Sequence, residues 1–197
     1  PMRKPKGGQA SPAGFALSDD FAHPALGLRW SFFAPGPGEA ARLRHEGRSL
    51  VMRGKGSSLA DCSPLTCITG DRSYEARVTL EVSGQGHGGL ALFYDQRCFA
   101  GIGYSAGQQL TYGQEQAWMR EPVAGGPLHL RVTNRDHVVK FEHSTDGQAW
   151  TAHPWQMEVS GFHHNGFGGF LSVRIGLFSA GAGELRFRDF AYRGLGA

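Results

Sequence analysis

The segment Tyr74–Val82, with the sequence YEARVTLEV, decides the fold class. Apolar residues occupy every second position from Tyr74 onward, and polar residues occupy the positions between them. Successive side chains of a β-strand point to opposite faces, so this strict alternation predicts a strand with one buried and one solvated face. Half-buried strands of this kind are typical of antiparallel sheets.

The same period of two recurs further along the chain, separated by residues that favour turns. The alternating segments are residues 128–132 (LHLRV), 139–143 (VKFEH) and 185–187 (LRF), and the turn signals are residues 134–136, 146–147 and 181–183. The glycine-rich stretch 84–89 (GQGHGG) lacks the lysine and the following helix of a phosphate-binding loop, so we expect a hairpin loop there. These signals predict short antiparallel strands joined by hairpins.

Two more continuous apolar runs, residues 89–94 and 173–178, are expected to be central strands. No stretch of ten residues combines a helical period with helix caps, which argues against a parallel β–α–β architecture. About a dozen expected strands favour two packed layers. The fold class is therefore predicted to be all-β, a β-sandwich of two antiparallel sheets.

Length and charge limit the number of domains and the classes of partner that we expect. The 197 residues suit one domain, with residues 1–16 read as a Pro- and Gly-rich linker and residues 17–195 as the sandwich. The net charge of +3 comes from basic residues that are scattered rather than clustered, so nucleic acid is not an expected partner. No run approaches 18 apolar residues, so no membrane span is expected either.

Three cysteines, Cys62, Cys67 and Cys98, fit neither a CxxC redox pair nor a zinc site. We expect buried thiols, with a Cys62–Cys67 disulfide as the alternative. Residues 1–14 contain no apolar stretch of the length that a signal peptide needs, and together with the thiols this favours the cytoplasm.

No catalytic or metal-binding constellation stands out. Glycoside hydrolysis needs two convergent carboxylates, but the Glu residues of the Tyr74–Val82 segment read as its solvent face, and Glu115 and Glu121 simply flank Trp118. The adjacent pair His163–His164 has no acidic residue or cysteine close by to complete a metal site. We expect no catalytic residue, no metal ligand and no cofactor.

Carboxylates at the two ends of the chain offer one exception. Asp19 and Asp20 lie near the start and Asp189 near the end, so pairing of the terminal strands would bring Asp20 and Asp189 together. Their oxygens could then bind a structural calcium ion. The competing interpretation is that they are ordinary carboxylates of turns and edge strands.

Four segments, taken in order, carry a family resemblance. They are residues 18–32 (SDDFAHPALGLRWSF), 89–95 (GLALFYD), 144–151 (STDGQAWT) and 187–193 (FRDFAYR). This ordered set resembles the C-terminal concanavalin A-like domain of glycoside hydrolase family 43, the β-xylosidase and arabinofuranosidase group. The resemblance covers about residues 17–194 and implies a jelly-roll sandwich.

The resemblance also implies a role beside a catalytic domain. In this family the catalytic carboxylates lie in an N-terminal five-bladed β-propeller, and a sandwich loop places a phenylalanine against the propeller's active site. The corresponding stretch here is residues 169–177 (GFLSVRIGL), so Phe170 is the expected active-site-completing residue and Phe167 the second choice. The stretch departs from the family's pattern at residues 171–172 and at Arg174, and the competing interpretation is that Phe170 is a core residue at a strand start.

Three functional hypotheses follow. The first is an accessory domain that supports and partly closes the active site of a propeller acting on xylan-derived oligosaccharides. The second is a free-standing xylan- or oligosaccharide-binding module, in which Tyr112 and Trp118 would stack on sugar rings. The third is a sandwich-fold glycosidase that uses Glu115 or Glu121.

Overall fold

The computed structural model describes residues 16–105, 108–113, 116–123 and 125–196, with the backbone alone over 108–112 and 116–122. Most of the expected linker, residues 1–15, lies outside the described residues. The described strands are β1 (Ser31–Phe32), β2 (Leu43–His45), β3 (Leu50–Arg53), β4 (Leu65–Ile68), β5 (Tyr74–Asp95), β6 (Cys98–Ser105), β7 (Gln108–Gly113), β8 (Gln116–Pro122), β9 (Leu128–Arg135), β10 (Val138–Ser144), β11 (Thr151–Glu158) and β12 (Arg174–Gly194). Two single helical turns, η1 (Glu39–Arg42) and α1 (His164–Phe167), complete the elements.

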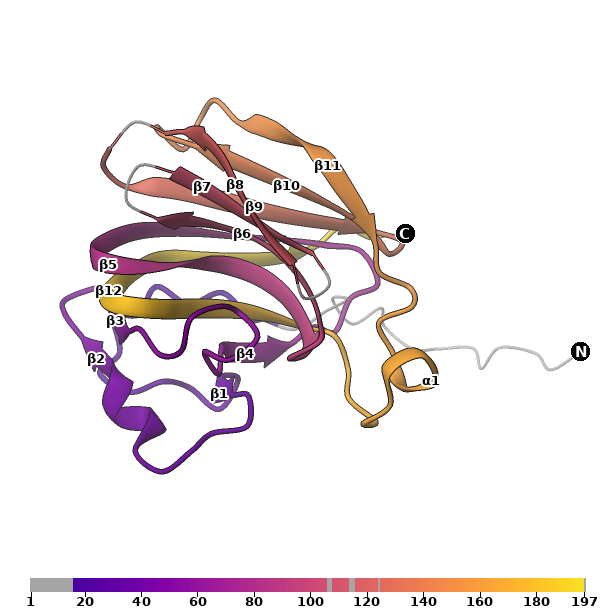
Figure 1. Cartoon of the computed structure of the whole chain (residues 1–197), viewed down its shortest axis with the longest axis horizontal. Helices are drawn as coiled ribbons and strands as arrows, with labels where there is room; N and C mark the ends of the chain where they lie inside the picture. Colours follow the sequence, from indigo (N-terminus) through magenta and orange to yellow (C-terminus); the bar gives the residue numbers. More distant parts are fainter. Residues whose placement is uncertain (1–15, 106–107, 114–115, 124, 197) are drawn as a thin grey trace, which may run out of the picture.

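The strands form two antiparallel layers that share their two longest members. One layer has the order β11-β10-β9-β5-β12-β3-β2, and the other has the order β8-β7-β6-β5-β12-β4-β1. The first half of β5 pairs with β9 and its second half with β6. Figure 1 shows β5 and β12 running side by side as long, bent strands through the molecule. The predicted all-β sandwich is confirmed.

The bend of the two long strands corrects two expectations from the sequence. The glycine-rich stretch 84–89 is not a hairpin loop, and residues 181–183 are not a turn, because both lie inside paired strands. Gly84 lies opposite Gly183, and a Cβ atom on Gly183 would lie only 2.3 Å from the carbonyl oxygen of Ser83. Facing glycines let the two backbones approach closely where they cross from one layer to the other.

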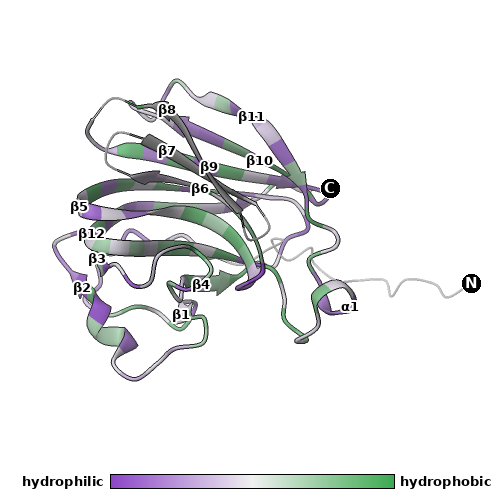
Figure 2. Ribbon diagram, in the orientation of Figure 1, coloured by the Kyte–Doolittle hydropathy of each residue, from purple (hydrophilic) through white to green (hydrophobic). Residues whose placement is uncertain are grey.

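The core lies between the layers and matches the alternation of the sequence. Ala76, Val78 and Leu80 of β5 are buried, whereas Arg77 between them is exposed. Of the two apolar runs expected as central strands, residues 89–94 are buried within β5 and residues 175–178 within β12. In Figure 2 these central strands carry most of the hydrophobic colour, and β11 at the rim is largely hydrophilic.

Two features close the domain. An antiparallel bridge joins Asp19 to Phe190, so the two ends of the sandwich meet as expected. The indole of buried Trp30 donates a hydrogen bond of 3.0 Å to Asp19 and packs edge-on against Phe190, with 4.9 Å between the ring centroids. Trp30 is therefore a core residue.

The cysteines are buried, and no disulfide joins Cys62 to Cys67. Burial raises the pKa of each of these two thiols to about 12. The prediction of buried thiols is confirmed for this pair, and the alternative of a bridge is wrong. No helix in the described part of the chain has the length and apolar character needed to cross a membrane.

Candidate functional site

The loop between β11 and β12, residues 159–173, holds the phenylalanines that the sequence singled out. We call it the Phe170 loop. It begins with buried Val159 and Phe162, which join the core, and Val159 donates a backbone hydrogen bond of 2.8 Å to His137. The short helix α1 follows, with the Nδ1 atom of His163 accepting a hydrogen bond from the amide of Asn165 at 3.1 Å.

Phe167 and Phe170 have opposite environments. Phe167 is half-buried and packs between Tyr94 and Phe162, with ring centroids 6.4 Å and 6.1 Å away. Phe170 is 89% exposed and lies outside the strand that follows it. The competing interpretation of Phe170 as a core residue at a strand start is therefore wrong.

The backbone projects Phe170 from the loop through an uncommon conformation. Gly168, Gly169 and Phe170 have φ angles of 77°, 83° and 49°. Glycine adopts positive φ without strain, but a bulky residue such as phenylalanine does so at a cost. Strained residues of this kind persist where the surrounding structure holds them, and they cluster at functional sites.

Two side chains, buried Tyr94 and exposed Arg97, hold the loop in place. The Tyr94 hydroxyl donates a hydrogen bond to the carbonyl of Gly168 and accepts one from the amide of Leu171 at 3.4 Å. Arg97 donates to the carbonyl of Phe167 at 2.7 Å. In the sequence Tyr94 belongs to an apolar run and to a segment of the family resemblance, and neither indicates this role, although a hydroxyl at the end of such a run needs a polar partner.

His164 supports the exposed ring directly. Its imidazole lies parallel to the Phe170 ring, with 5.0 Å between centroids and 15° between planes. The two rings therefore form a stacked pair at the surface, within the range at which aromatic pairs attract. His163 does not share this role, since it caps α1, so the pair His163–His164 has a structural explanation that needs no metal.

The other candidate residues are less completely described. Tyr112 lies on β7 and Trp118 on β8, and the backbones of these strands pair, but both side chains lie outside the described residues. Glu115 lies outside them entirely, and only the backbone of Glu121 is described. The assignment of Tyr112 and Trp118 to sugar stacking, and of the two glutamates to catalysis, stays a prediction.

The glutamates of β5 are engaged in ion pairs. Glu75 pairs with Arg193 at 3.1 Å and Glu81 with Arg188 at 2.5 Å. Each carboxylate thus has a guanidinium beside it rather than a second carboxylate. This arrangement suits a solvent face and not the paired acids of a glycosidase.

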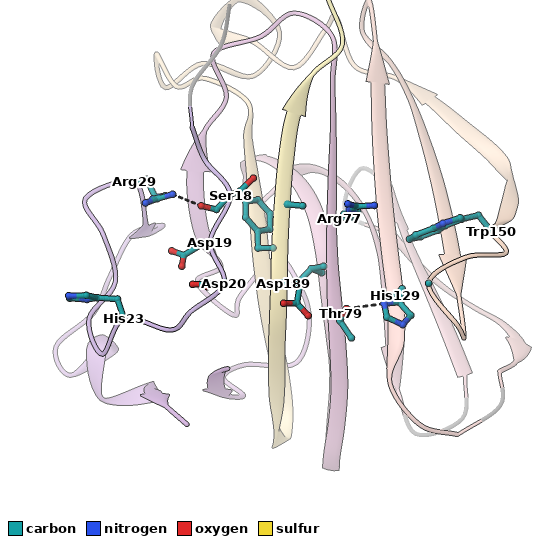
Figure 3. A pocket seen from close by; sticks show the side chains of 14 residues that line it. Ser18, Asp19, Asp20, His23, Arg29, Arg77, Thr79, His129, Trp150 and Asp189 are labelled. Atoms are coloured by element: carbon teal, nitrogen blue, oxygen red, sulfur yellow. Dashed lines mark hydrogen bonds between the residues drawn. The ribbon is translucent and has the colours of Figure 1, made fainter. Parts of the chain in front are cut away.

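Asp19, Asp20 and Asp189 line one groove, drawn in Figure 3. The Asp19 carboxylate accepts a hydrogen bond from the indole of Trp30, and Asp20 forms an ion pair with Arg48 at 2.5 Å. Among the residues that the structure describes, no three His, Cys, Asp or Glu side chains gather so that they could hold a metal ion. The calcium site near Asp20 and Asp189 stays a prediction.

Comparison with solved structures finds this fold in longer glycoside hydrolases. BlXynB, a GH43 protein from Bacillus licheniformis, superposes with a TM-score of 0.80 at 17% identity over 97% of this chain and 41% of its own. Xylan β-1,4-xylosidase from Bacillus halodurans C-125 gives a TM-score of 0.77 at 17% identity over 98% of this chain and 42% of its own. The chain thus spans about two-fifths of the length of these structures.

A shorter structure shares the fold more distantly. A functionally unknown protein from Saccharomyces cerevisiae gives a TM-score of 0.56 at 14% identity, over 86% of this chain and 98% of its own. Among curated proteins, none matches the sequence significantly.

The family itself follows from the sequence match. Residues 18–193, nearly the whole of the described sandwich, match the model of the β-xylosidase C-terminal concanavalin A-like domain, GH43_C2. That match agrees with the two-layer fold and with the superpositions on GH43 structures. The chain therefore belongs to the family of β-xylosidase C-terminal concanavalin A-like domains.

Proposed function

We propose that this domain completes the active site of a five-bladed family 43 propeller in the same polypeptide, with Phe170 forming one wall of the pocket. The observation that carries the proposal is the display of Phe170, which is 89% exposed at a position held by hydrogen bonds to buried Tyr94. Burying a phenylalanine ring removes apolar surface from water and is worth about 1.5–3 kcal/mol. A ring held out of its own core is ready to gain that energy against a partner.

The surroundings of Phe170 support a contact face at this end of the sandwich. Ile68, on β4, pairs in register with Arg174, the first residue of the strand that follows the Phe170 loop. Ile68 is itself exposed, one of three large apolar residues that are so among the described residues. The match to GH43 structures that are more than twice as long supports a partner domain for this face.

The proposed chemistry assigns binding and not bond cleavage to this chain. An apolar ring at the rim of a sugar pocket excludes water and limits how much of the substrate chain can enter. We propose xylan-derived oligosaccharides as the substrates of the whole protein and no cofactor for this domain. We also place the protein in the cytoplasm, with the buried thiols of Cys62 and Cys67 as support.

The test is the Phe170→Ala variant of the protein as its source produces it. Turnover of an aryl xyloside and an aryl arabinofuranoside should fall at least about tenfold in kcat/KM, which corresponds to about 1.4 kcal/mol of transition-state stabilisation. Leu28→Ala is the matched control, because Leu28 is also an exposed apolar residue but lies in a different loop. Unchanged kcat/KM in Phe170→Ala would overturn the proposal.

A free-standing binding module is the second candidate function. The yeast structure favours it, because there a related fold fills 98% of the chain. In that case xylan should retard the 197-residue chain in affinity electrophoresis, and Trp118→Ala or Tyr112→Ala should abolish the retardation. Hydrolysis of aryl glycosides by the 197-residue chain, lost in Glu115→Gln or Glu121→Gln, would instead support the sandwich glycosidase.

A further inference from the structure

A groove crosses the outer face of the layer that contains β9, and no residue of the Phe170 loop lines it. Its volume is about 710 Å³, within the range of ~300–1,000 Å³ that is usual for ligand pockets. Figure 3 shows its lining side chains coming from the N-terminal segment, β12, β5, β9 and the loop before β11. It is therefore assembled from parts of the chain that lie far apart in the sequence.

The floor of the groove is a break in the pairing of β5 with β12. Thr79 pairs with Arg188 and Arg77 with Ala191, so residues 189 and 190 form a bulge between them. Asp189 adopts a φ of 52° in this bulge, which projects its side chain into the groove (Figure 3). Bulges of this kind re-aim side chains and are common beside functional sites.

The two walls are fixed by hydrogen bonds. The N-terminal segment is tied to β12 by the bridge between Asp19 and Phe190. On the other side, the Asp146 carboxylate accepts hydrogen bonds of 2.8 Å from the amides of Gln148 and Ala149. These bonds fix the backbone of the turn that immediately precedes Trp150. These bonds lower the pKa of Asp146, so its charge persists at neutral pH. The groove is thus preformed.

Most charged side chains on this layer are paired, and two in the groove are not. Arg131 pairs with Glu142 through two hydrogen bonds of 2.6 Å and 2.7 Å, and Glu75 pairs with Arg193. By contrast, within the described part of the chain the side chains of Arg77 and Asp189 have neither a hydrogen-bond nor an ion-pair partner. The groove is therefore lined by one strong hydrogen-bond donor, Arg77, and one strong acceptor, Asp189, that are available to a ligand.

Trp150 adds a flat apolar wall. The guanidinium of Arg131 lies over its ring, 4.1 Å from the centroid, and Arg131 is itself held by Glu142. The ring is half-buried and therefore still partly open to the groove that it lines. His129, on the floor, is oriented by a hydrogen bond of 2.9 Å with Thr79.

The mixture of charges selects the class of ligand. A simple anion would meet the carboxylates of Asp20 and Asp189, and a simple cation would meet the guanidinium of Arg77. A neutral ligand that both donates and accepts hydrogen bonds, and that has an apolar face for Trp150, satisfies all of these groups. Sugar rings have this combination.

We propose that this groove binds a neutral oligosaccharide, with Arg77 and Asp189 bonding the hydroxyl groups and Trp150 packing on a ring face. The site is separate from the Phe170 loop, which precedes β12 and leads into the opposite layer. A second sugar site on the same polypeptide would raise the local concentration of substrate chains near a catalytic pocket. The ligand class follows from the groove, and only the choice of xylan sugars rests on the proposed function.

The experiment is an NMR titration of the isotope-labelled 197-residue chain with xylotriose, and with cellotriose and maltotriose in parallel. We expect a neutral trisaccharide to shift the indole signal of Trp150 in a saturable manner. Arg77→Gln and Asp189→Asn should each weaken binding at least about tenfold, because each replaces a charged hydrogen-bonding group with a neutral amide that bonds more weakly. Asparagine tolerates the positive φ of residue 189, so that variant preserves the backbone.

Arg135→Gln is the matched control, since Arg135 is an exposed arginine on β9 that makes no ion pair in the described part of the chain and does not line the groove. Its affinity should equal that of the original chain, and so should that of Phe170→Ala. Binding of cellotriose or maltotriose but not of xylotriose supports the groove while speaking against xylan as the substrate. Absence of binding by all three sugars, stronger binding of glucuronate, or unchanged affinity in both groove variants would overturn the inference.

Discussion

Buried Tyr94 holds the chain on both sides of exposed Phe170. Its hydroxyl donates to the carbonyl of Gly168 and accepts from the amide of Leu171, which are the groups that bracket the exposed ring. The core strand β5 thereby sets the position of a side chain at the surface. The display of Phe170 is a property of the folded sandwich and needs no partner to form it.

Removal of the Tyr94 hydroxyl should loosen the Phe170 loop. In Tyr94→Phe the amide of Leu171 loses its acceptor, so its hydrogen exchange should become faster, and the free energy of unfolding should fall by about 1 kcal/mol. Hydrogen exchange read by NMR measures the first effect, and denaturant unfolding measures the second.

Tyr192→Phe is the control for that experiment. The Tyr192 hydroxyl donates to Asp71 at 2.8 Å, away from the loop. This variant should lose a similar amount of stability and leave the exchange of the Leu171 amide unchanged. Equal exchange at Leu171 in both variants would contradict the role given to Tyr94.

The two phenylalanines of the loop should differ in their effect on stability. Phe170→Ala should change the free energy of unfolding by no more than about 0.5 kcal/mol, because the ring is already in water. Phe167→Ala should cost about 2 kcal/mol, below the ~3–5 kcal/mol of a fully buried phenylalanine, because Phe167 is half-buried. Denaturant unfolding of both variants checks the contrast, and a larger loss in Phe170→Ala would refute it.

The bend of β5 and β12 depends on glycine at specific positions. A Cβ atom on Gly88 would lie 2.0 Å from the carbonyl oxygen of Phe178 and 2.5 Å from the Leu185 side chain. Gly88→Ala should therefore lower the free energy of unfolding by about 1–3 kcal/mol. At Gly125 no neighbouring atom lies within 4 Å, so Gly125→Ala should be nearly neutral. Equal unfolding midpoints for the two variants would show that the close approach is not needed.

Stability should fall in mildly acidic solution because of two half-buried imidazoles. Burial lowers the pKa of His87 and of His143 below the ordinary value of 6.5. As the pH falls, these histidines bind protons at a higher pH in the unfolded chain than in the folded one. The free energy of unfolding is therefore highest above pH 6.5 and decreases as the pH drops toward the folded-state pKa. Unfolding measured between pH 7.5 and about 5 should show this slope, and His87→Gln combined with His143→Gln should reduce it. A slope that persists in the double variant would assign the effect to other groups.

The sequence predicts the layers of this fold better than their connections. Alternation in Tyr74–Val82 identifies buried Ala76, Val78 and Leu80 correctly, because strand geometry imposes the period directly. The glycine-rich stretch 84–89 was predicted as a loop, since glycine is typical of turns, whereas here it permits two strands to cross closely. Local composition does not reveal contacts with a strand about one hundred residues away.

The site shows the same limit. Family resemblance pointed to Phe170, and its exposure agrees with a contact role, but the support by Tyr94 and His164 depends on tertiary packing. The groove could not be predicted from the sequence either. Arg77, Asp189 and Trp150 come together only through the register of β5 with β12 and through the loop before β11. Only the meeting of Asp19 with the end of the chain could be anticipated from the pairing of terminal strands.

The intact mass of the protein that carries this sequence, captured by antibody from the cells that make it, tests the proposed role of Phe170 most directly. We predict a single polypeptide of more than twice 21.3 kDa, since related structures contain this fold as about two-fifths of their chains. A mass of 21.3 kDa would contradict the role of Phe170 in completing a pocket of the same polypeptide. It would favour a free-standing sugar-binding module instead.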